Sequence, residues 1–395
     1  MPAIRSLAYR KILNSHVELT NEFVVELDDG SVGNGASARG ETISIYEDRT
    51  APVDPETVIR TIKGDGYLGR TLQQEDFDSY LQQRISRFGR HNAYGLSLAF
   101  FNALSTSRSA GDLLGRPQAK LAPPRLCCNI LNGGWHAYTN PVLSDWAEYL
   151  LVARSNDIAS VIEGHNEIQR AVKERLAGRA KTVVGGNPVN RFATADNREC
   201  IEFLLGIRDS LGLSDEFDLM IDASAGDLLT AEGYRLAVTG GPAFSREAFC
   251  DYWLDIIRQY DLRFLEDPFA EEDIESWQRL TAAQRTCYVI GDNLYSSDAS
   301  RIEAGAAAGY THGAVIKPSQ AGTVSAVCRA IEAAQRSGQV AITSHRSIST
   351  ESVLLSTLTC LYGVGYIKIG PLMTDYSAVL RLNQIIRLTG GLTCP

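Results

Sequence analysis

DLMIDAS, residues 218–224, predicts a short buried strand that ends in a carboxylate, Asp222. Three later runs repeat this pattern of an apolar strand ending in a charged residue: RFLEDPF (263–269) with Glu266, YVIGDN (288–293) with Asp292, and HGAVIKPSQ (312–320) with Lys317. The carboxyl ends of parallel strands in a barrel meet at one rim. We therefore expect these four side chains to converge there.

The chemistry of this group follows from its residue types. Asp222, Glu266 and Asp292 supply three hard oxygen ligands, which is the kind of ligand set that Mg²⁺ prefers. Lys317 would stand beside that ion, where it is a candidate base for removing a proton from the carbon next to a metal-bound carboxylate. Each carboxylate taken alone could also be the N-cap of the following helix.

Further polar residues follow other predicted strands. VAITSHRS (340–347) ends in His345, Arg346 and Ser347, and YIKIG (366–370) contains Lys368. The fork of Arg346 suits a phosphate, Ser347 adds a hydroxyl, and Lys368 offers a compact charge for a carboxylate. In NILNGGWHA (129–137), His136 follows a pair of glycines that let the backbone approach a ligand closely. Together these residues predict a small phosphorylated acid as the substrate.

Composition excludes several classes of function. The 395 residues carry a formal charge of −9, which argues against a nucleic-acid surface. No apolar stretch is long enough to span a bilayer, and residues 1–13 do not resemble a secretory signal. The eight cysteines are scattered and include no CxxC pair, so neither zinc nor a redox motif is indicated. We expect a cytoplasmic protein with buried thiols and no membrane partner.

The order of patterns predicts two domains and an α/β fold. Alternating residues around an Asp-Gly turn at 16–31 predict an antiparallel sheet, and HNAYGLSLAFFNALS (91–105) predicts a buried helix. The proline-containing LAPPRL (121–126) marks a boundary, so we assign 1–125 to an α+β domain and 126–395 to a barrel. In the second part, strand-like runs alternate with helix-length segments, which favours a β/α barrel over a doubly wound sheet.

The chain resembles the enolase family almost from end to end. The matching stretches are AYRKILNSHVELTNEFVVELDDGS, NGASARGE, NAYGLSLA, NILNGGWHA, FLEDPF, IGDNL, VIKPSQAGT, SHRSISTE and IKIG. The resemblance implies an N-terminal α+β cap domain, an enolase-type (β/α)8 barrel with an antiparallel second strand, a homodimer and two Mg²⁺ ions.

It also implies a role for each matching residue. Asp222, Glu266 and Asp292 look like ligands of the first metal, and Ser37 looks like the mobile-loop serine that binds the second. Lys317 looks like the base that takes the proton from C2 of 2-phosphoglycerate, with a pKa lowered by the metal and by Lys368. The remaining matches look like contacts to the substrate's carboxylate and phosphate, and like the histidine that closes on it: Lys368, His345, Arg346, Ser347 and His136.

Several departures from the family pattern lie in segments that we expect to surround the substrate entrance. The family's loop glutamate, which helps the hydroxyl leave, falls on Asn187 of VVGGNPVNRFAT (183–194), and an amide cannot donate a proton as an acid. A second family glutamate falls on Glu148, or on Asp145 if no gap is allowed; the apolar run after Glu148 favours the first. Arg39 is added beside the entrance, and the segment after Ser347 reads ISTESV (348–353) without the family's acidic character.

Three interpretations remain open. The protein is a working enolase in which another acid replaces the lost glutamate, or a non-catalytic relative kept for binding. Alternatively, it is a paralogue acting on an analogue of 2-phosphoglycerate, such as a carboxyphosphonoenolpyruvate synthase-type enzyme of phosphonate or phosphinate natural-product biosynthesis.

Overall fold

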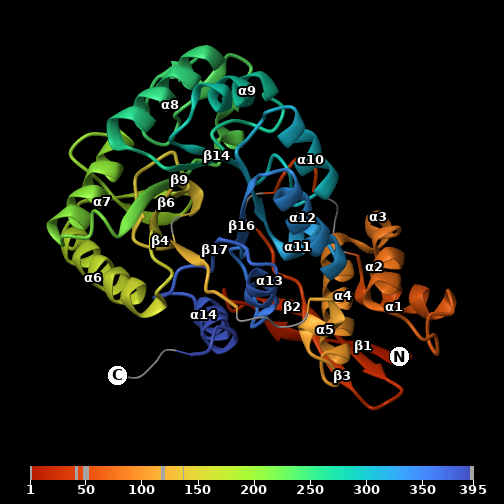
Figure 1. Ribbon diagram of the computed structural model, residues 1–395. Coiled ribbons are helices and arrows are strands. Elements are labelled where there is room, and N and C mark those ends of the chain that lie inside the picture. Colours follow the sequence, from red (N-terminus) through yellow and green to blue (C-terminus); the bar gives the residue numbers. More distant parts are fainter. Residues whose placement is uncertain (1, 41–42, 48–52, 117–120, 137, 392–395) are drawn as a thin grey trace.

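The computed structural model describes residues 2–40, 43–47, 53–116, 121–136 and 138–391. The chain begins with a three-stranded antiparallel sheet of β1 (Ile4–Leu13), β2 (Leu19–Leu27) and β3 (Val32–Ala36). The helices of this N-terminal part are α1 (Pro55–Gly64), α2 (Gln74–Gln82), α3 (Ile85–Phe88), α4 (Arg90–Leu104) and α5 (Ala110–Leu113). In Figure 1 this part is red to orange and lies beside the barrel.

Helix α4 packs directly on the sheet because two glycines of β3 let the backbones approach. A Cβ at Gly33 would lie 2.1 Å from the backbone nitrogen of Ala103, and one at Gly35 would lie 2.2 Å from the carbonyl oxygen of Gly95. Any larger residue would push the helix away. The sheet and helix expected from the N-terminal patterns are therefore present, with their own core around Phe23, Phe77 and Phe100.

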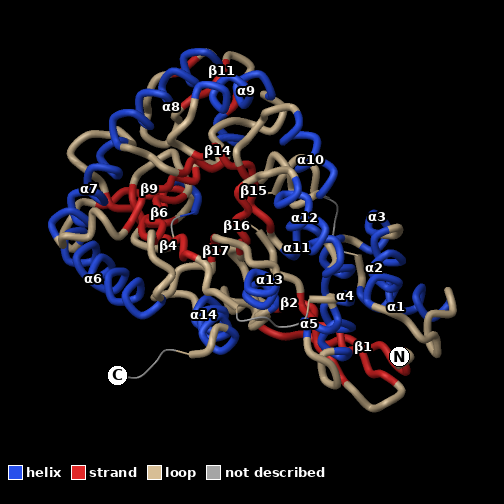
Figure 2. Tube along the Cα trace, in the orientation of Figure 1, coloured by secondary structure: helices blue, strands red, loops and turns tan. Residues whose placement is uncertain are grey.

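Eight strands close into a barrel, which Figure 2 shows as a ring of red strands inside a ring of helices. In order around the barrel they are β4 (Arg125–Gly133), β6 (Glu148–Ala153), β9 (Phe217–Asp222), β13 (Phe264–Glu266), β14 (Tyr288–Gly291), β15 (Gly313–Ile316), β16 (Val340–Ser344) and β17 (Tyr366–Lys368). Strand β17 pairs with β4 and completes the ring. Only β6, the second strand, is antiparallel to both neighbours. The predicted fold, including its antiparallel second strand, is confirmed.

Amphipathic helices cover the outside of the barrel. They are α6 (Ile158–Leu176), α7 (Arg198–Ser210), α8 (Arg246–Tyr260), α9 (Ile274–Ala283), α10 (Ala299–Ala307), α12 (Val324–Arg336), α13 (Leu354–Leu361) and α14 (Tyr376–Leu388). Smaller elements lie in the connections: η1 (Gly134–His136), β5 (Pro141–Val142), β7 (Lys181–Val184), β8 (Asn187–Asn190), η2 (Ala225–Leu228), β10 (Leu229–Thr230), β11 (Gly233–Arg235), β12 (Ala243–Phe244) and α11 (Pro318–Ala321). Buried side chains from the strands, including Leu150, Met220 and Ile342, form a compact cluster. Such side chains fill a barrel of this size, so its chemistry is confined to the rim.

A buried carboxylate joins the two parts of the chain. Asp78 of α2 accepts hydrogen bonds from the Ser97 hydroxyl of α4 (2.5 Å) and from the backbone N–H of Ser325 (2.7 Å). Ser325 lies in the first turn of α12, where the helix dipole and free N–H groups favour an anion. This contact anchors the N-terminal helices on the barrel.

The structure also shows the state of the cysteines and the character of the helices. The seven described cysteines are all buried and unpaired. No helix in the described part of the chain combines the length and the apolar character needed to cross a bilayer.

Candidate active site

The strand register brings the predicted charged residues to one rim. Asp222 at the end of β9 pairs with Glu266 at the end of β13 and with Glu148 at the start of β6. Because β6 runs in the opposite direction, its first residue reaches the rim where the other strands end. Ser344 of β16 pairs with Lys368 of β17 on the other side of the ring.

Lys368 lies among three carboxylates. Its Nζ is 2.9 Å from Glu148 Oε2, 3.1 Å from Asp222 Oδ2 and 2.9 Å from Glu266 Oε2. The side chain of Lys368 is 4% exposed and that of Glu266 is fully buried. Asn129 of β4 donates to the other oxygen of Glu148 at 2.7 Å and holds its orientation. The sequence patterns did not single out Asn129.

Lys317 makes the second ion pair of the rim, with Asp292 Oδ2. The loop that carries Asp292 is held by Asp267, whose carboxylate accepts hydrogen bonds from the backbone N–H groups of Asp292 (2.9 Å) and Asn293 (2.8 Å). Asp267 directly follows Glu266 and has a left-handed backbone with a φ of 43°. Its place in the FLEDPF stretch was the only signal that could have identified it.

Burial and mutual charge shift the ionisation of this cluster. Burial alone would lower the pKa of Lys368, but Glu148, Glu266 and Asp222 outweigh it and hold that pKa well above its usual value. Burial also lowers the pKa of Lys317, and attraction to Asp292 and Glu266 again outweighs it, so this pKa is raised. The depression of the Lys317 pKa that a bound metal and Lys368 would cause stays a prediction, because the charges that raise this pKa here are those of carboxylates that the metal would bind.

His345 is a neutral histidine with one defined tautomer. Burial, followed by the positive charges of Arg381 and Lys368, lowers its pKa well below the usual value. Its Nδ1 lies 3.2 Å from the carbonyl oxygen of Lys368. A carbonyl can only accept, so Nδ1 carries the hydrogen and Nε2 is an acceptor. In this state His345 is suited to accept a hydrogen bond from a hydroxyl and not to donate one to an anion.

Arg346 is held by a partner that sequence patterns did not indicate. Its Nη1 and Nη2 donate to Glu47 of the N-terminal part at 2.7 and 2.9 Å. Gln320 also contacts Glu47 at 3.4 Å and accepts a hydrogen bond from Ser297 at 2.7 Å. The Ser297 hydroxyl in turn accepts from the backbone N–H of Lys317 at 2.8 Å. A continuous chain of contacts therefore connects Arg346 with Lys317.

Two cavities open at this rim. The smaller, about 40 Å³, is lined by Asp222, Asp292, Lys317 and Lys368 among others. The larger, about 200 Å³, is lined by Asn132, Thr139 and Asp375 and reaches Ser15 and His16 of the β1–β2 turn. Both cavities share the side chains of His136, Glu148, His345 and Ser347. The predicted base Lys317 and its partner Lys368 line the smaller cavity, and the predicted phosphate-binding Ser347 lines both.

Other predicted residues lie nearby or elsewhere. The Ser37 hydroxyl is 3.0 Å from His91 Nδ1 and does not line these two cavities. Asn187 pairs with Val184 across the β7–β8 hairpin and does not line them either. Asp145 is bound by the backbone N–H of Val238 at 2.7 Å, away from both cavities, which favours Glu148 for the second acid. Arg39 is exposed and pairs through its backbone with Ile348.

The donor set is compatible with a divalent cation. Among the described residues, no three His, Cys, Asp or Glu side chains are spaced as a preformed metal site, and the ammonium groups of Lys317 and Lys368 bind the carboxylates instead. However, Asp292 Oδ1 is buried and has no hydrogen-bond partner. A buried carboxylate oxygen without a partner is unfavourable, and hard oxygen donors are those that Mg²⁺ binds. Asp222, Glu266 and Asp292 therefore fit such an ion.

Comparisons with known proteins agree with this geometry. A family model described as "Enolase, C-terminal TIM barrel domain" matches residues 120–393. A protein named enolase from Acidothermus cellulolyticus is 29% identical over 98% of this chain and 94% of its own length. Another, from Sulfolobus acidocaldarius, is 26% identical over 93% of this chain and 91% of its own length.

Proposed function

The chain belongs to the enolase family, and from this premise we propose that it is a Mg²⁺-dependent lyase acting on 2-phosphoglycerate or a close phosphorylated or phosphonate analogue. The reaction removes the proton at C2, expels the C3 hydroxyl as water and leaves an enolpyruvate product. The observation that carries the proposal is the rim itself. Two lysines and the carboxylates of Glu148, Asp222, Glu266 and Asp292 meet there beside a cavity of about 200 Å³.

A bound divalent cation would supply charge neutralisation for the substrate carboxylate, which makes the C2 proton more acidic. Lys317 lies at the end of β15 and lines the smaller cavity, so we assign to it the removal of that proton. For this step its amine must be neutral, which requires that its ion pair with Asp292 be broken or offset. Lys368 would then provide the positive charge for the substrate carboxylate.

The other roles follow from hydrogen-bonding capacity. Arg346 and Ser347 are assigned to the phosphorus group because a guanidinium fork and a hydroxyl suit its oxygens. For this role the contacts of Arg346 with Glu47 must be shared with the substrate or exchanged for it. The neutral His345 offers an acceptor at Nε2 for a substrate hydroxyl. Glu148, which lines both cavities, is assigned to donate its own proton to the departing hydroxyl in place of the glutamate missing at Asn187. For this step Glu148 must carry a proton, which requires that its ion pair with Lys368 be broken. His136 lines the mouth and would close over the substrate.

Purified protein with Mg²⁺ and 2-phosphoglycerate tests the proposal. Phosphoenolpyruvate formation is followed by ultraviolet absorbance, and exchange of the C2 proton into heavy water is followed by NMR. Rapid product formation supports an enolase in which Glu148 replaces the lost acid. Exchange without product supports the same base with a different native substrate. Neither exchange nor product would reject the lyase for this substrate and favour a binding protein with an enolase fold.

A carboxyphosphonoenolpyruvate synthase-type reaction is the second candidate, favoured by a specific feature beside Arg346. The segment 348–353 keeps one acidic residue, Glu351, and its serines and threonine line a further cavity that also contains two buried arginines. Conversion of an activated phosphonoformate together with 2-phosphoglycerate would support this candidate. Fast production of ordinary phosphoenolpyruvate with no such conversion would reject it.

A further inference from the structure

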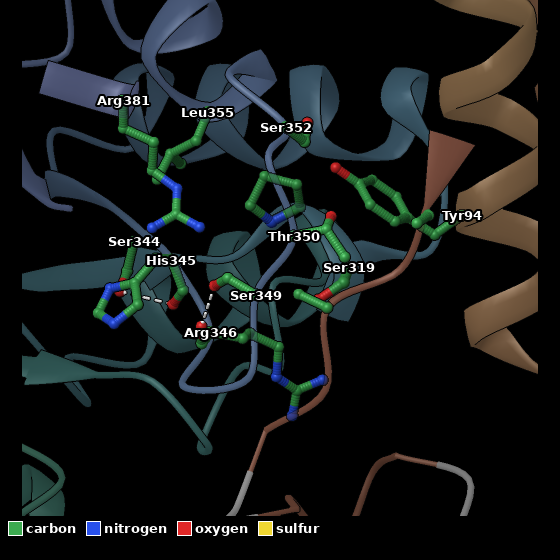
Figure 3. A pocket seen from close by; sticks show the side chains of 13 residues that line it. Tyr94, Ser319, Ser344, His345, Arg346, Ser349, Thr350, Ser352, Leu355 and Arg381 are labelled. Carbon is green, nitrogen blue, oxygen red and sulfur yellow. Dashed lines mark hydrogen bonds between the residues drawn. The ribbon is translucent and has the colours of Figure 1, made fainter. Parts of the chain in front are cut away.

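A third cavity, of about 40 Å³, lies behind His345 and is shown in Figure 3. Ser344 and His345 line both this cavity and the one that contains Lys317. Its walls come from distant parts of the chain: the end of β3, helix α4, helix α11, the segment after β16, and helices α13 and α14. The volume corresponds to about three water-sized groups, which is the size of a carboxylate.

The lining of this cavity is cationic and rich in hydroxyl groups. No Asp or Glu is among the lining residues, whereas hydroxyls come from Tyr94, Ser319, Thr350 and Ser352. Figure 3 shows the Arg381 side chain extending from α14 toward Ser344 and His345. These groups can all donate hydrogen bonds, and together they form a surface that suits an anion.

Arg381 is a buried cation without a direct counterion. It is 4% exposed, and its Nη1 donates to the carbonyl oxygen of Ile369 at 2.8 Å. None of the ion pairs among the described residues involves Arg381, and the charge of Asp375 acts on it without forming one. Burial lowers the pKa of Arg381 to about 10, so the guanidinium is still charged at neutral pH.

Ser319 supplies a second, independent indication of a ligand. This residue follows Lys317 by two positions, is 4% exposed, and its hydroxyl has no hydrogen-bond partner. A buried hydroxyl without a partner is unfavourable unless a ligand or water completes the site. The unpartnered hydroxyl of Ser319 and the guanidinium of Arg381, which has no ion-pair partner among the described residues, line the same space.

We propose that this cavity is a subsite for a second anionic group, a carboxylate carried on the phosphorus end of the substrate. The proposal rests on the proposed function, in which Arg346 and Ser347 hold the phosphorus group. Ser344 and His345 line both this cavity and the cavity that contains Lys317. A group bonded directly to a phosphorus atom held between Ser347 and Arg346 would therefore lie next to the third cavity. A simple phosphate ester would leave it filled with water. The preferred substrate class is therefore a phosphonate that carries a carboxylate on phosphorus.

The experiment compares two probes by calorimetry in the presence of Mg²⁺: phosphonoformate, which has a carboxylate on phosphorus, and methylphosphonate, which lacks it. In the unchanged protein we expect phosphonoformate to bind at least 10-fold more tightly. Arg381→Met is expected to remove this advantage, and Ser319→Ala to reduce it severalfold. Arg387→Met, on an exposed position of the same helix, is the matched control and is expected to keep the full advantage.

Equal binding of the two probes, or an advantage that survives Arg381→Met, would overturn the proposal. If Arg381→Met does not fold, Ser319→Ala decides: an unchanged advantage in that variant also overturns it. The C2 exchange assay keeps this test separate from the proposed function. A phosphonoformate preference that depends on Arg381, without any C2 exchange, supports the subsite and rejects the lyase. C2 exchange without that preference supports the lyase and rejects the subsite.

Discussion

Lys368→Met is expected to destabilise the barrel by removing the one ammonium group shared by Glu148, Asp222 and Glu266. The three contacts are 2.9–3.1 Å long and deeply buried. Methionine nearly matches the volume of lysine, so the change removes charge without opening a large cavity. Three carboxylates would then remain close together with no direct counterion.

The magnitude follows from two opposing terms. At an effective dielectric constant of about 20, each contact near 3 Å is worth about 5 kcal/mol of attraction. The desolvation of the ammonium and of the carboxylates cancels most of this sum. Removal of one partner from a buried ion pair costs about 3–5 kcal/mol. We expect a loss of that size in the free energy of unfolding near pH 7, partly recovered when Mg²⁺ is added, since a divalent cation can replace the lost charge.

Urea unfolding followed by circular dichroism measures this loss, with and without Mg²⁺. Lys181→Met, at an exposed position of β7, is the matched control and is expected to change stability by less than about 0.5 kcal/mol. A loss below about 1 kcal/mol for Lys368→Met, or one equal to the control, would refute the reasoning. It would mean that Lys368 does not neutralise the carboxylates of the rim.

Three other predictions concern stability, metal and assembly. Asp78→Ala leaves the backbone N–H of Ser325 and the Ser97 hydroxyl without their partner, so the free energy of unfolding should fall by about 2–4 kcal/mol. Glu75→Ala, at an exposed position of the same helix, is the control and should change it little. A chelator should abolish C2 exchange, Mg²⁺ should restore it, and exchange that persists in the chelator would exclude a metal role. Light scattering should give the mass of a homodimer; a monomeric mass at micromolar concentration would contradict this.

Much of the rim could be predicted because each of its charged residues is marked by a short pattern in the sequence around it. Asp222, Glu266 and Lys317 each terminate an apolar run, and parallel strands bring such ends together without any further information. The position of Glu148 was harder to infer. It begins a strand that runs against its neighbours, and only the family resemblance indicated that β6 is antiparallel.

Other parts of the site depend on contacts that no local pattern encodes. Glu47 and Arg346 are 299 residues apart, and their pairing follows from how the N-terminal part docks on the barrel. Asn187 belongs to a hairpin whose turn, Gly185 and Gly186 with φ of 57° and 85°, is visible in the sequence as a Gly-Gly pair. Arg381 has no sequence signal at all, because an arginine on an amphipathic helix is usually exposed.

The central claim is that Lys317 removes the C2 proton, and one measurement tests it most directly. Proton exchange at C2 of 2-phosphoglycerate is followed by NMR in heavy water for the unchanged protein, Lys317→Ala and the exposed control Lys181→Ala, with folding checked by circular dichroism. We predict that Lys317→Ala lowers the exchange rate about 10²- to 10⁴-fold and that the control leaves it unchanged. Exchange in folded Lys317→Ala at a rate close to that of the unchanged protein would contradict the account.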